Sequence, residues 1–301
     1  MKLLKRFISF WDHPKRAAWF FVLPALIIFV VFIIVPMIGS IILGFFSLDN
    51  SLTNWNFVGL GNFQDLMTDD RFWNSLKNTF FYAAIEVPLN LLLSLSVALY
   101  LQKNSFWRKT CRTFFFVPNL FSLTAVGITW KILLDRNGAI AQLMRSVGLQ
   151  PVNFLNSTEF AMPTIIGVSL WFGFGFNMIL FVSGLQSISP TYYEAARIDG
   201  ASSWQQFRSI TLPLLVPTLS FCLITHIIRA LQVFAQPYVM TDGGPLFKTE
   251  TVLLYMYSRG FRYSPFDIGY ASAITEILFV IIVVLTILMY RFFLKREVTE
   301  V

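Results

Sequence analysis

Six long apolar stretches divide the sequence and constrain its fold more than any other feature. They run from Trp19 to Phe46, Phe80 to Leu101, Thr113 to Leu134, Pro163 to Leu185, Leu214 to Met240 and Ile268 to Phe293. A helix needs about 20 mostly apolar residues to cross the hydrocarbon core of a bilayer. The sequence therefore predicts an all-α, polytopic membrane protein with six transmembrane helices, built as a single domain over residues 1–301.

The composition agrees with a lipid environment. The chain is 56% hydrophobic and 13% charged, whereas a soluble domain carries about a quarter charged residues. Its net charge of +7 does not by itself indicate nucleic-acid binding, because membrane proteins gather Lys and Arg in cytoplasmic loops. We expect membrane lipid, and no nucleic acid, among its partners. Cys111 and Cys222 have no C-x-x-C or His-rich neighbour, so we expect no disulfide and no metal site.

The distribution of basic residues predicts the orientation. The amino-terminal segment MKLLKRFISFWDHPKR is basic, and the apolar run after it has no small-residue cleavage site. We therefore expect an uncleaved first helix. Placing the amino terminus inside puts most Lys and Arg residues on the inner side, including those around Lys103 and Arg112 and those from Arg291 to Arg296. Both termini are predicted to be cytoplasmic.

The segment between the fourth and fifth stretches, residues 189–213, does not look like a plain linker. Its sequence is SPTYYEAARIDGASSWQQFRSITLP. Ser189 is suited to cap a helix, and Gly200 to end it in the left-handed conformation. Ser203 with Gln206 suggests a capping box for a second short helix, which we expect Pro213 to end. The pattern predicts two short helices joined at a glycine, on the cytoplasmic side.

The side chains of this segment suit a protein interface. Its four charges sum to zero, and aromatic or apolar residues lie among them: Glu194, Arg197, Asp199 and Arg208 against Tyr192, Tyr193, Ile198, Trp204 and Phe207. Aromatic anchors among balanced charges are typical of protein contacts. An amphipathic helix lying on the membrane is the alternative.

A known signature occurs in the same segment. Glu194-Ala195-Ala196, then Gly200, then Ile210, Leu212 and Pro213 follow the spacing E-A-A, three residues, G, nine residues, I-x-L-P. This resembles the EAA loop of bacterial ABC importer permeases. Asp242-Gly243-Gly244-Pro245, Thr249 and Gly269-Tyr270-Ala271-Ser272-Ala273 resemble the carbohydrate-uptake branch, of the maltose and sn-glycerol-3-phosphate type.

The resemblance implies a fold, a role and partners. The fold would be that of a type I ABC importer (MetI-like) permease in a bacterial cell (inner) membrane. Residues 189–213 would be the coupling loop, in which Glu194 contacts an ATPase, Ala195 and Ala196 permit close approach, and Gly200 forms the elbow. The ATPase-coupling residues would be Tyr193, Glu194, Ala195, Ala196, Asp199, Gly200, Ile210, Leu212 and Pro213. The implied partners are a second homologous permease, two cytoplasmic ABC ATPase subunits, and an extracellular or periplasmic solute-binding protein.

The chain lacks the motifs of the common enzymes. It contains no G-x-x-x-x-G-K-[ST], H-E-x-x-H or G-x-S-x-G sequence, which argues against ATP binding by the usual route and against hydrolase chemistry. We expect no enzyme and no cofactor, with ATP and Mg²⁺ bound by the partner ATPase subunits.

Two stripes at helical spacing are candidates for the substrate pathway. They are Ser169, Phe172, Gly173, Phe176 and Asn177 on the fourth stretch, and His226, Arg229, Ala230 and Val233 on the fifth. Substrate sites of transporters tend to lie near the bilayer midplane, where polar residues are otherwise costly. Aromatic faces with hydrogen-bonding edges suit sugars, and the resemblance places sugar contacts on these two helices.

Each candidate keeps an alternative. Arg229 could instead pair with Glu276 or with the partner permease, and His226 could be a hydrogen-bonded interior residue. Glu86 and Glu276 fit helix packing or a pathway. An importer of glycerol phosphate, with Arg229 as phosphate partner, is the second candidate. A stand-alone ion-coupled transporter or channel is the third, and the EAA loop argues against it.

Overall fold

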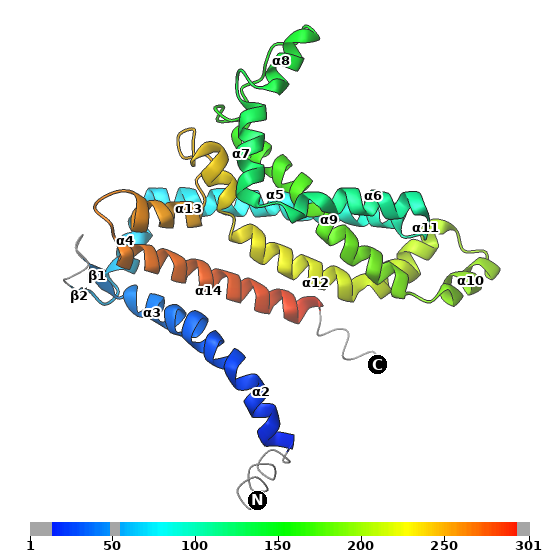
Figure 1. Ribbon diagram of the computed structural model, residues 1–301, viewed down its shortest axis with the longest axis horizontal. Helices are drawn as coiled ribbons and strands as arrows, with labels where there is room; N and C mark the ends of the chain where they lie inside the picture. Colours follow the sequence, from blue (N-terminus) through cyan, green and yellow to red (C-terminus); the bar gives the residue numbers. More distant parts are fainter. Residues whose placement is uncertain (1–13, 49–54, 294–301) are drawn as a thin grey trace, which may run out of the picture. The chain divides into compact units, whose positions relative to one another are not determined.

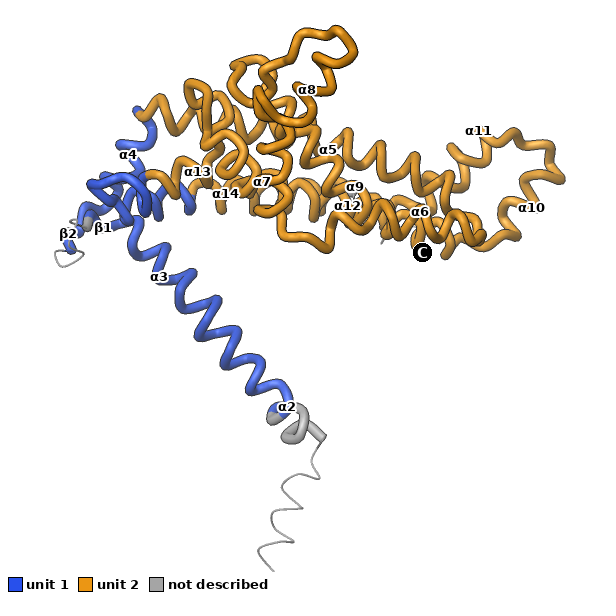
Figure 2. The backbone as a smooth tube through the Cα atoms, turned by 45° about the horizontal axis from the view of Figure 1, so that its top comes forward, with its two compact units in different colours: residues 1–68, 259–276 blue, residues 69–258, 277–301 orange. Residues whose placement is uncertain are grey.

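The computed structural model describes residues 14–48 and 55–293. Within them the chain is mostly helical and contains one short two-stranded sheet. It divides into two compact units, Met1–Thr68 with Arg259–Glu276 and Asp69–Ser258 with Ile277–Val301 (Figure 2). The basic residues Lys2, Lys5, Arg6, Lys295 and Arg296, which support the predicted orientation, lie outside the described residues.

Five helices are long and apolar enough to span a membrane, and a sixth span is formed if one bent helix pair is counted. The five are Phe21–Leu43, Asp70–Leu101, Ala161–Ser187, Ser203–Leu231 and Ile268–Phe292. These confirm five of the predicted stretches as helices. The predicted sixth span, Ile268 to Phe293, coincides with helix α14 (Ile268–Phe293).

Unit 1 contains the first span and the short sheet. The span consists of α2 (Pro14–Phe29), the π-helical turn η1 (Val30–Ile34) and α3 (Val35–Leu43). Strand β1 (Phe46–Leu48) then pairs antiparallel with β2 (Trp55–Phe57), and α4 (Gly61–Thr68) follows. The predicted first stretch was therefore too long at its end, because Phe46 belongs to the strand.

A buried amide organises the end of this first span. Asn62 on α4 donates from Nδ2 to the carbonyls of Gly44, at 2.8 Å, and Phe46, at 3.0 Å. These carbonyls lie beyond the last helical turn and would otherwise lack partners. A Cβ at Gly269, in the first turn of α14, would collide with the Phe46 carbonyl, so glycine permits this close approach.

Unit 2 is built around three packed helices. Helix α5 (Asp70–Leu101) packs on α9 (Ala161–Ser187), and both pack on α12 (Leu212–Leu231) (Figure 1). Their shared core includes Val87, Phe181 and Leu215, all nearly or fully buried. The other helices of the unit are α6 (Phe106–Phe116), α7 (Leu123–Leu134), α8 (Ala139–Ser146), α10 (Pro190–Ile198), α11 (Ser203–Gln206) and α13 (Val252–Tyr257).

The predicted third span, Thr113 to Leu134, is not one straight helix. Helix α6 ends in the 3-10 turn η2 (Val117–Leu120), and α7 starts after a break, with a bend of 95° between the two segments. Pro118 lies in the 3-10 turn and Ser122 has extended backbone angles just before α7. Proline removes a helical hydrogen bond, and the extended Ser122 starts a new helix in another direction.

The predicted fifth span, Leu214 to Met240, was displaced at both ends. The helix begins at Ser203, passes through the π-helical turn η3 (Phe207–Thr211) and ends at Leu231. Residues 232–234 leave the helix before the next helical segment, which contains the π-helical turn η4 (Pro237–Thr241). This break matters because it forms one wall of a cavity.

Candidate functional site

A cavity of about 360 Å³ opens inside unit 2. Its walls come from α5, η2, α7, α9, the end of α12 and residues 232–236 between α12 and η4. The lining residues are Tyr82, Glu86, Asn119, Leu123, Ser169, Phe172, Gly173, His226, Arg229, Ala230, Gln232, Val233, Phe234, Ala235 and Gln236.

The structure brings seven of the predicted pathway residues together around this cavity. They are Ser169, Phe172, Gly173, His226, Arg229, Ala230 and Val233. Phe176 and Asn177 do not line it. The Phe176 ring lies beneath the Arg229 guanidinium, with 5.6 Å between Cζ and the ring centroid, and Asn177 is buried in the helix packing. That substrate passes these residues remains a prediction.

A buried hydrogen-bond network borders the cavity and joins its three helices. His226 on α12 contacts Glu86 on α5, with 2.8 Å between Nε2 and Oε2. Asn177 on α9 donates from Nδ2 to His226 Nδ1 at 3.2 Å and to Asn90 Oδ1 at 2.9 Å. Because Nδ1 accepts, the ring carries its proton on Nε2 and donates it to Glu86.

The same network supplies hydrogen bonds to the buried carboxylate of Glu86. Asn90 donates from Nδ2 to Glu86 Oε1 at 3.1 Å, and only 3% of Glu86 is exposed. The structure shows the hydrogen-bonded interior role predicted as the alternative for His226 and the packing role predicted for Glu86, whereas a part in the substrate pathway stays a prediction. These two residues satisfy each other in the helix packing, and they also contribute to the cavity wall.

Two amide side chains that sequence patterns did not indicate also reach the cavity. Gln236 donates from Nε2 to Ser169 Oγ at 3.2 Å, and it lies directly before η4. Asn119 lies in the 3-10 turn η2, and its Nδ2 finds no hydrogen-bond partner among the described residues. The signal for the first was the pair of polar residues Gln232 and Gln236 before Pro237, inside an otherwise apolar stretch.

Arg229 has a different environment from Glu86. The residue is exposed, and within the described part of unit 2 its guanidinium forms no ion pair. The predicted pairing partner Glu276 belongs to unit 1. An unpaired guanidinium on a membrane-spanning helix must meet water or an anion.

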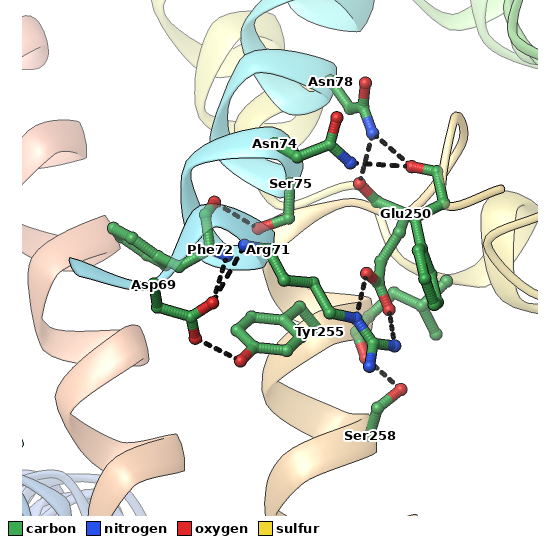
Figure 3. Close-up of polar contacts among 11 residues, drawn as sticks. Asp69, Arg71, Phe72, Asn74, Ser75, Asn78, Glu250, Tyr255 and Ser258 are labelled. Carbon is green, nitrogen blue, oxygen red and sulfur yellow. Dashed lines mark hydrogen bonds and ion pairs between the residues drawn. The ribbon is translucent and has the colours of Figure 1, made fainter. Parts of the chain in front are cut away.

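An ion pair at the start of α5 holds the segment that follows the cavity wall (Figure 3). Arg71 contacts Glu250 through two bonds, Nε to Oε2 at 2.8 Å and Nη2 to Oε1 at 2.7 Å. Asn78 donates from Nδ2 to the carbonyls of Phe247, at 2.8 Å, and Glu250, at 2.9 Å. We call Arg71, Asn78 and Glu250 the clasp. Sequence spacing could not indicate it, because it joins residues about 170 positions apart.

The clasp continues directly into the cavity wall. Thr251, next to Glu250, donates from Oγ1 to the carbonyl of Val233 at 2.8 Å, and both residues are buried. Since Val233 lines the cavity, the clasp fixes part of its non-helical wall.

The predicted coupling loop lies at the end of unit 2 opposite α13 (Figures 1 and 2). Helix α10 is capped as predicted, since Ser189 Oγ accepts from the Thr191 amide. Gly200 has a φ of 77°, the left-handed conformation that glycine adopts without strain.

The second half of the loop differs from the prediction in two ways. The capping box is formed by Ser202 and Gln205, one residue earlier than expected, because Gln206 turns back and donates to the Ala201 carbonyl. Pro213 does not end a helix. It is the second residue of α12, directly after the π-helical turn η3, and α11, η3 and α12 form one continuous helix.

The coupling-loop residues divide between an exposed surface and an inner face. Ile198 is 86% exposed, Trp204 68% and Tyr192 55%. Of the predicted coupling residues, the exposed ones are Glu194, Ala195, Asp199, Gly200 and Pro213, and the partly buried ones are Tyr193, Ala196, Ile210 and Leu212. The Tyr193 hydroxyl lies 3.0 Å from Thr211 Oγ1, which ties α10 to the start of α12.

Comparisons with known proteins agree with this architecture. Residues 90–297 match the family described as binding-protein-dependent transport system inner membrane component. The chain is 36% identical to the probable ABC transporter permease protein YesP of Bacillus subtilis, over 91% of this chain and 89% of that protein. It is 32% identical to the lactose transport system permease protein LacF of Rhizobium radiobacter, over 93% and 94% respectively.

A solved structure has the same fold over nearly the whole length. It is a chain of a bacterial alginate ABC transporter, crystallised in complex with an alginate pentasaccharide-bound periplasmic protein. The TM-score is 0.79 at 25% sequence identity, covering 96% of this chain and 98% of that one.

Proposed function

Because this chain belongs to the family of binding-protein-dependent transport system inner membrane components, we propose that it forms half of the pathway of an ATP-driven oligosaccharide importer. Its fold is the all-α, polytopic fold of the type I importer permeases. The chain is a multi-pass membrane protein and a permease, not an enzyme, since the ATPase of such a transporter is a separate subunit.

The cavity in unit 2 is the observation that supports a sugar as the solute. It places the aromatic rings of Tyr82 and Phe172 beside the polar side chains of Ser169 and Gln236. Sugar rings offer apolar C–H faces and polar hydroxyl edges, which match such a lining. Several relatives are named for lactose, for trehalose and maltose, or for starch degradation products.

The coupling loop supports the proposed ATPase contact. Tyr192, Ile198 and Trp204 expose apolar surface on two short helices, and exposed aromatic and apolar anchors are typical of protein docking sites. In the proposed transporter this surface enters a groove on a cytoplasmic ATPase subunit, which binds ATP and Mg²⁺. Closure of the ATPase dimer would then move the attached α9 and α12 as rigid bodies.

The remaining partners follow from this arrangement. A second, homologous permease would complete the pathway, a second ATPase would serve it, and an extracellular or periplasmic solute-binding protein would deliver the sugar. Both termini and α10 would face the cytoplasm. The loop before α13 would then lie at the outer side, since it is at the opposite end of unit 2 (Figure 1).

The deciding experiment changes the exposed face of the coupling loop. Glu194→Lys and Gly200→Val are expected to abolish copurification of the ATPase, together with ATP-dependent uptake. Glu159→Lys is the matched control, because Glu159 is an exposed acidic residue on a different loop, and it should leave both unchanged. Normal uptake in the two coupling variants would contradict the proposal. Uptake that persists after ATP depletion, with ion gradients held, would instead support a stand-alone carrier.

A further inference from the structure

Two N–H donor groups of the cavity lining have no hydrogen-bond or ion-pair partner among the described residues of unit 2. Arg229 forms no ion pair within the described part of unit 2, and Asn119 Nδ2 has no partner among the described residues. Both groups are N–H donors, and both residues line the cavity. A ligand that binds these two groups must offer acceptors to them.

Glu86, the acidic residue of the lining, already accepts hydrogen bonds from neighbouring side chains. Glu86 accepts from His226 Nε2 at 2.8 Å and from Asn90 Nδ2 at 3.1 Å. His226 is neutral in this arrangement, because its Nδ1 accepts from Asn177. The guanidinium of Arg229 is thus the charge that the cavity leaves available to a ligand.

The position of Arg229 favours a ligand in which a planar anionic group is attached to a sugar ring. Its guanidinium lies over the face of Phe176, which is 40% exposed. The cation–π contact holds the guanidinium near the ring, and its rigid fork of N–H donors matches a carboxylate in a bidentate manner. The aromatic lining then suits the sugar ring to which the carboxylate is attached.

On these grounds we propose that the solute is an acidic oligosaccharide whose uronate carboxylate binds Arg229, with Asn119 as a second donor. This inference rests on the proposed function and specifies that the imported oligosaccharide is negatively charged. It agrees with the solved relative that imports the acidic polysaccharide alginate, to which the chain is 26% identical with a TM-score of 0.76.

The test compares matched ligands on the complete transporter, reconstituted in nanodiscs. Equilibrium binding is measured for a radiolabelled tetragalacturonate and for the same oligosaccharide after reduction of its carboxylates to alcohols. The wild type is expected to bind the acidic form more tightly. Arg229→Gln should lower the acidic-to-neutral affinity ratio by at least about tenfold, the loss expected for a charge-assisted bidentate contact, and Arg229→Lys by less.

Copurification of the partner subunits checks that each variant assembles. Equal wild-type affinity for the two forms would overturn the proposal, and so would an equal loss of both forms in Arg229→Gln. Tighter binding of a sugar phosphate than of the uronate would mean that Arg229 binds a phosphate, and it would overturn the uronate assignment. If the transporter takes up only neutral oligosaccharides in an ATP-dependent manner, the acidic-substrate proposal is overturned and the proposed function stands.

Discussion

His226 on α12 donates from Nε2 to Glu86 Oε2 on α5, at 2.8 Å, in the interior of unit 2. The two residues are 140 positions apart in the chain and only 8% and 3% exposed. A buried carboxylate is tolerated only when hydrogen bonds compensate for the water it loses. The pair therefore stabilises the packing of α5 on α12 and holds the cavity wall in one arrangement.

Removing both members of this pair should cost less than the two single removals added together. His226→Ala leaves the Glu86 carboxylate buried without its main donor, so we expect a loss of about 3–5 kcal/mol in the free energy of unfolding. The double variant Glu86→Leu with His226→Leu removes the charge as well and should lose less than the sum of the single variants. Thermal unfolding in detergent measures both. Additive losses would show that the pair is not coupled.

Two glycines of α9 provide a matched test of helix packing. A Cβ at Gly175 would collide with the carbonyl of Phe115 on α6, whereas a Cβ at Gly167 meets nothing within 4 Å. Gly175→Ala should therefore destabilise the protein by about 1–3 kcal/mol, because α6 must move away. Gly167→Ala should be neutral or stabilising by up to about 1 kcal/mol, through helix propensity. The same unfolding assay compares them, and equal effects would contradict the observed crossing of α6 and α9.

The long helices could be predicted because crossing a bilayer requires a long apolar run. Hydropathy places α14 at its observed ends. It fails at the third span, because a count of apolar residues does not register that Pro118 and Ser122 turn the chain by 95°. It fails again after Leu231, where residues 232–234 leave the helix within an apolar stretch.

The candidate site could be predicted only where one helix contributes several residues. Helical spacing brought Ser169, Phe172 and Gly173 to one face, and all three line the cavity. Tyr82 and Asn119 come from other helices, and only tertiary packing brings them to the same space. For the same reason the clasp between Arg71 and Glu250 has no local signal.

Tyr193 offers a way to separate ATPase docking from the transmission of motion. Its hydroxyl lies 3.0 Å from Thr211 Oγ1, on the inner face of the coupling loop. Tyr193→Phe removes this hydrogen bond, worth about 0.5–1.5 kcal/mol, and keeps the ring. We expect the ATPase to copurify normally and to hydrolyse ATP, while fewer sugar molecules are imported per ATP. Tyr192→Phe is the control, because Tyr192 lies on the exposed face. An unchanged number of sugar molecules imported per ATP in Tyr193→Phe would show that this hydrogen bond does not transmit motion from the ATPase to the membrane helices.

The loop held by the clasp can be examined by limited proteolysis. Asp242, Leu246 and Phe247 all have positive φ angles, between 50° and 57°, which are uncommon for residues other than glycine and persist only where surrounding contacts hold them. Lys248 is exposed at the tip of this loop and is a site for trypsin.

Breaking the clasp should release that loop. In Arg71→Met the buried carboxylate of Glu250, 3% exposed, loses both of its bonds to the guanidinium, and the loop should open far more often. Because cleavage follows the population of the open form, trypsin should cut after Lys248 at least about tenfold faster. Arg71→Lys keeps the charge without the fork of donors, so its cleavage rate should lie between those of the wild type and Arg71→Met. Adding Lys248→Gln to Arg71→Met should remove the new fragment, which identifies the cut. An unchanged cleavage rate in Arg71→Met would mean that the amide bonds from Asn78 hold the loop without the ion pair.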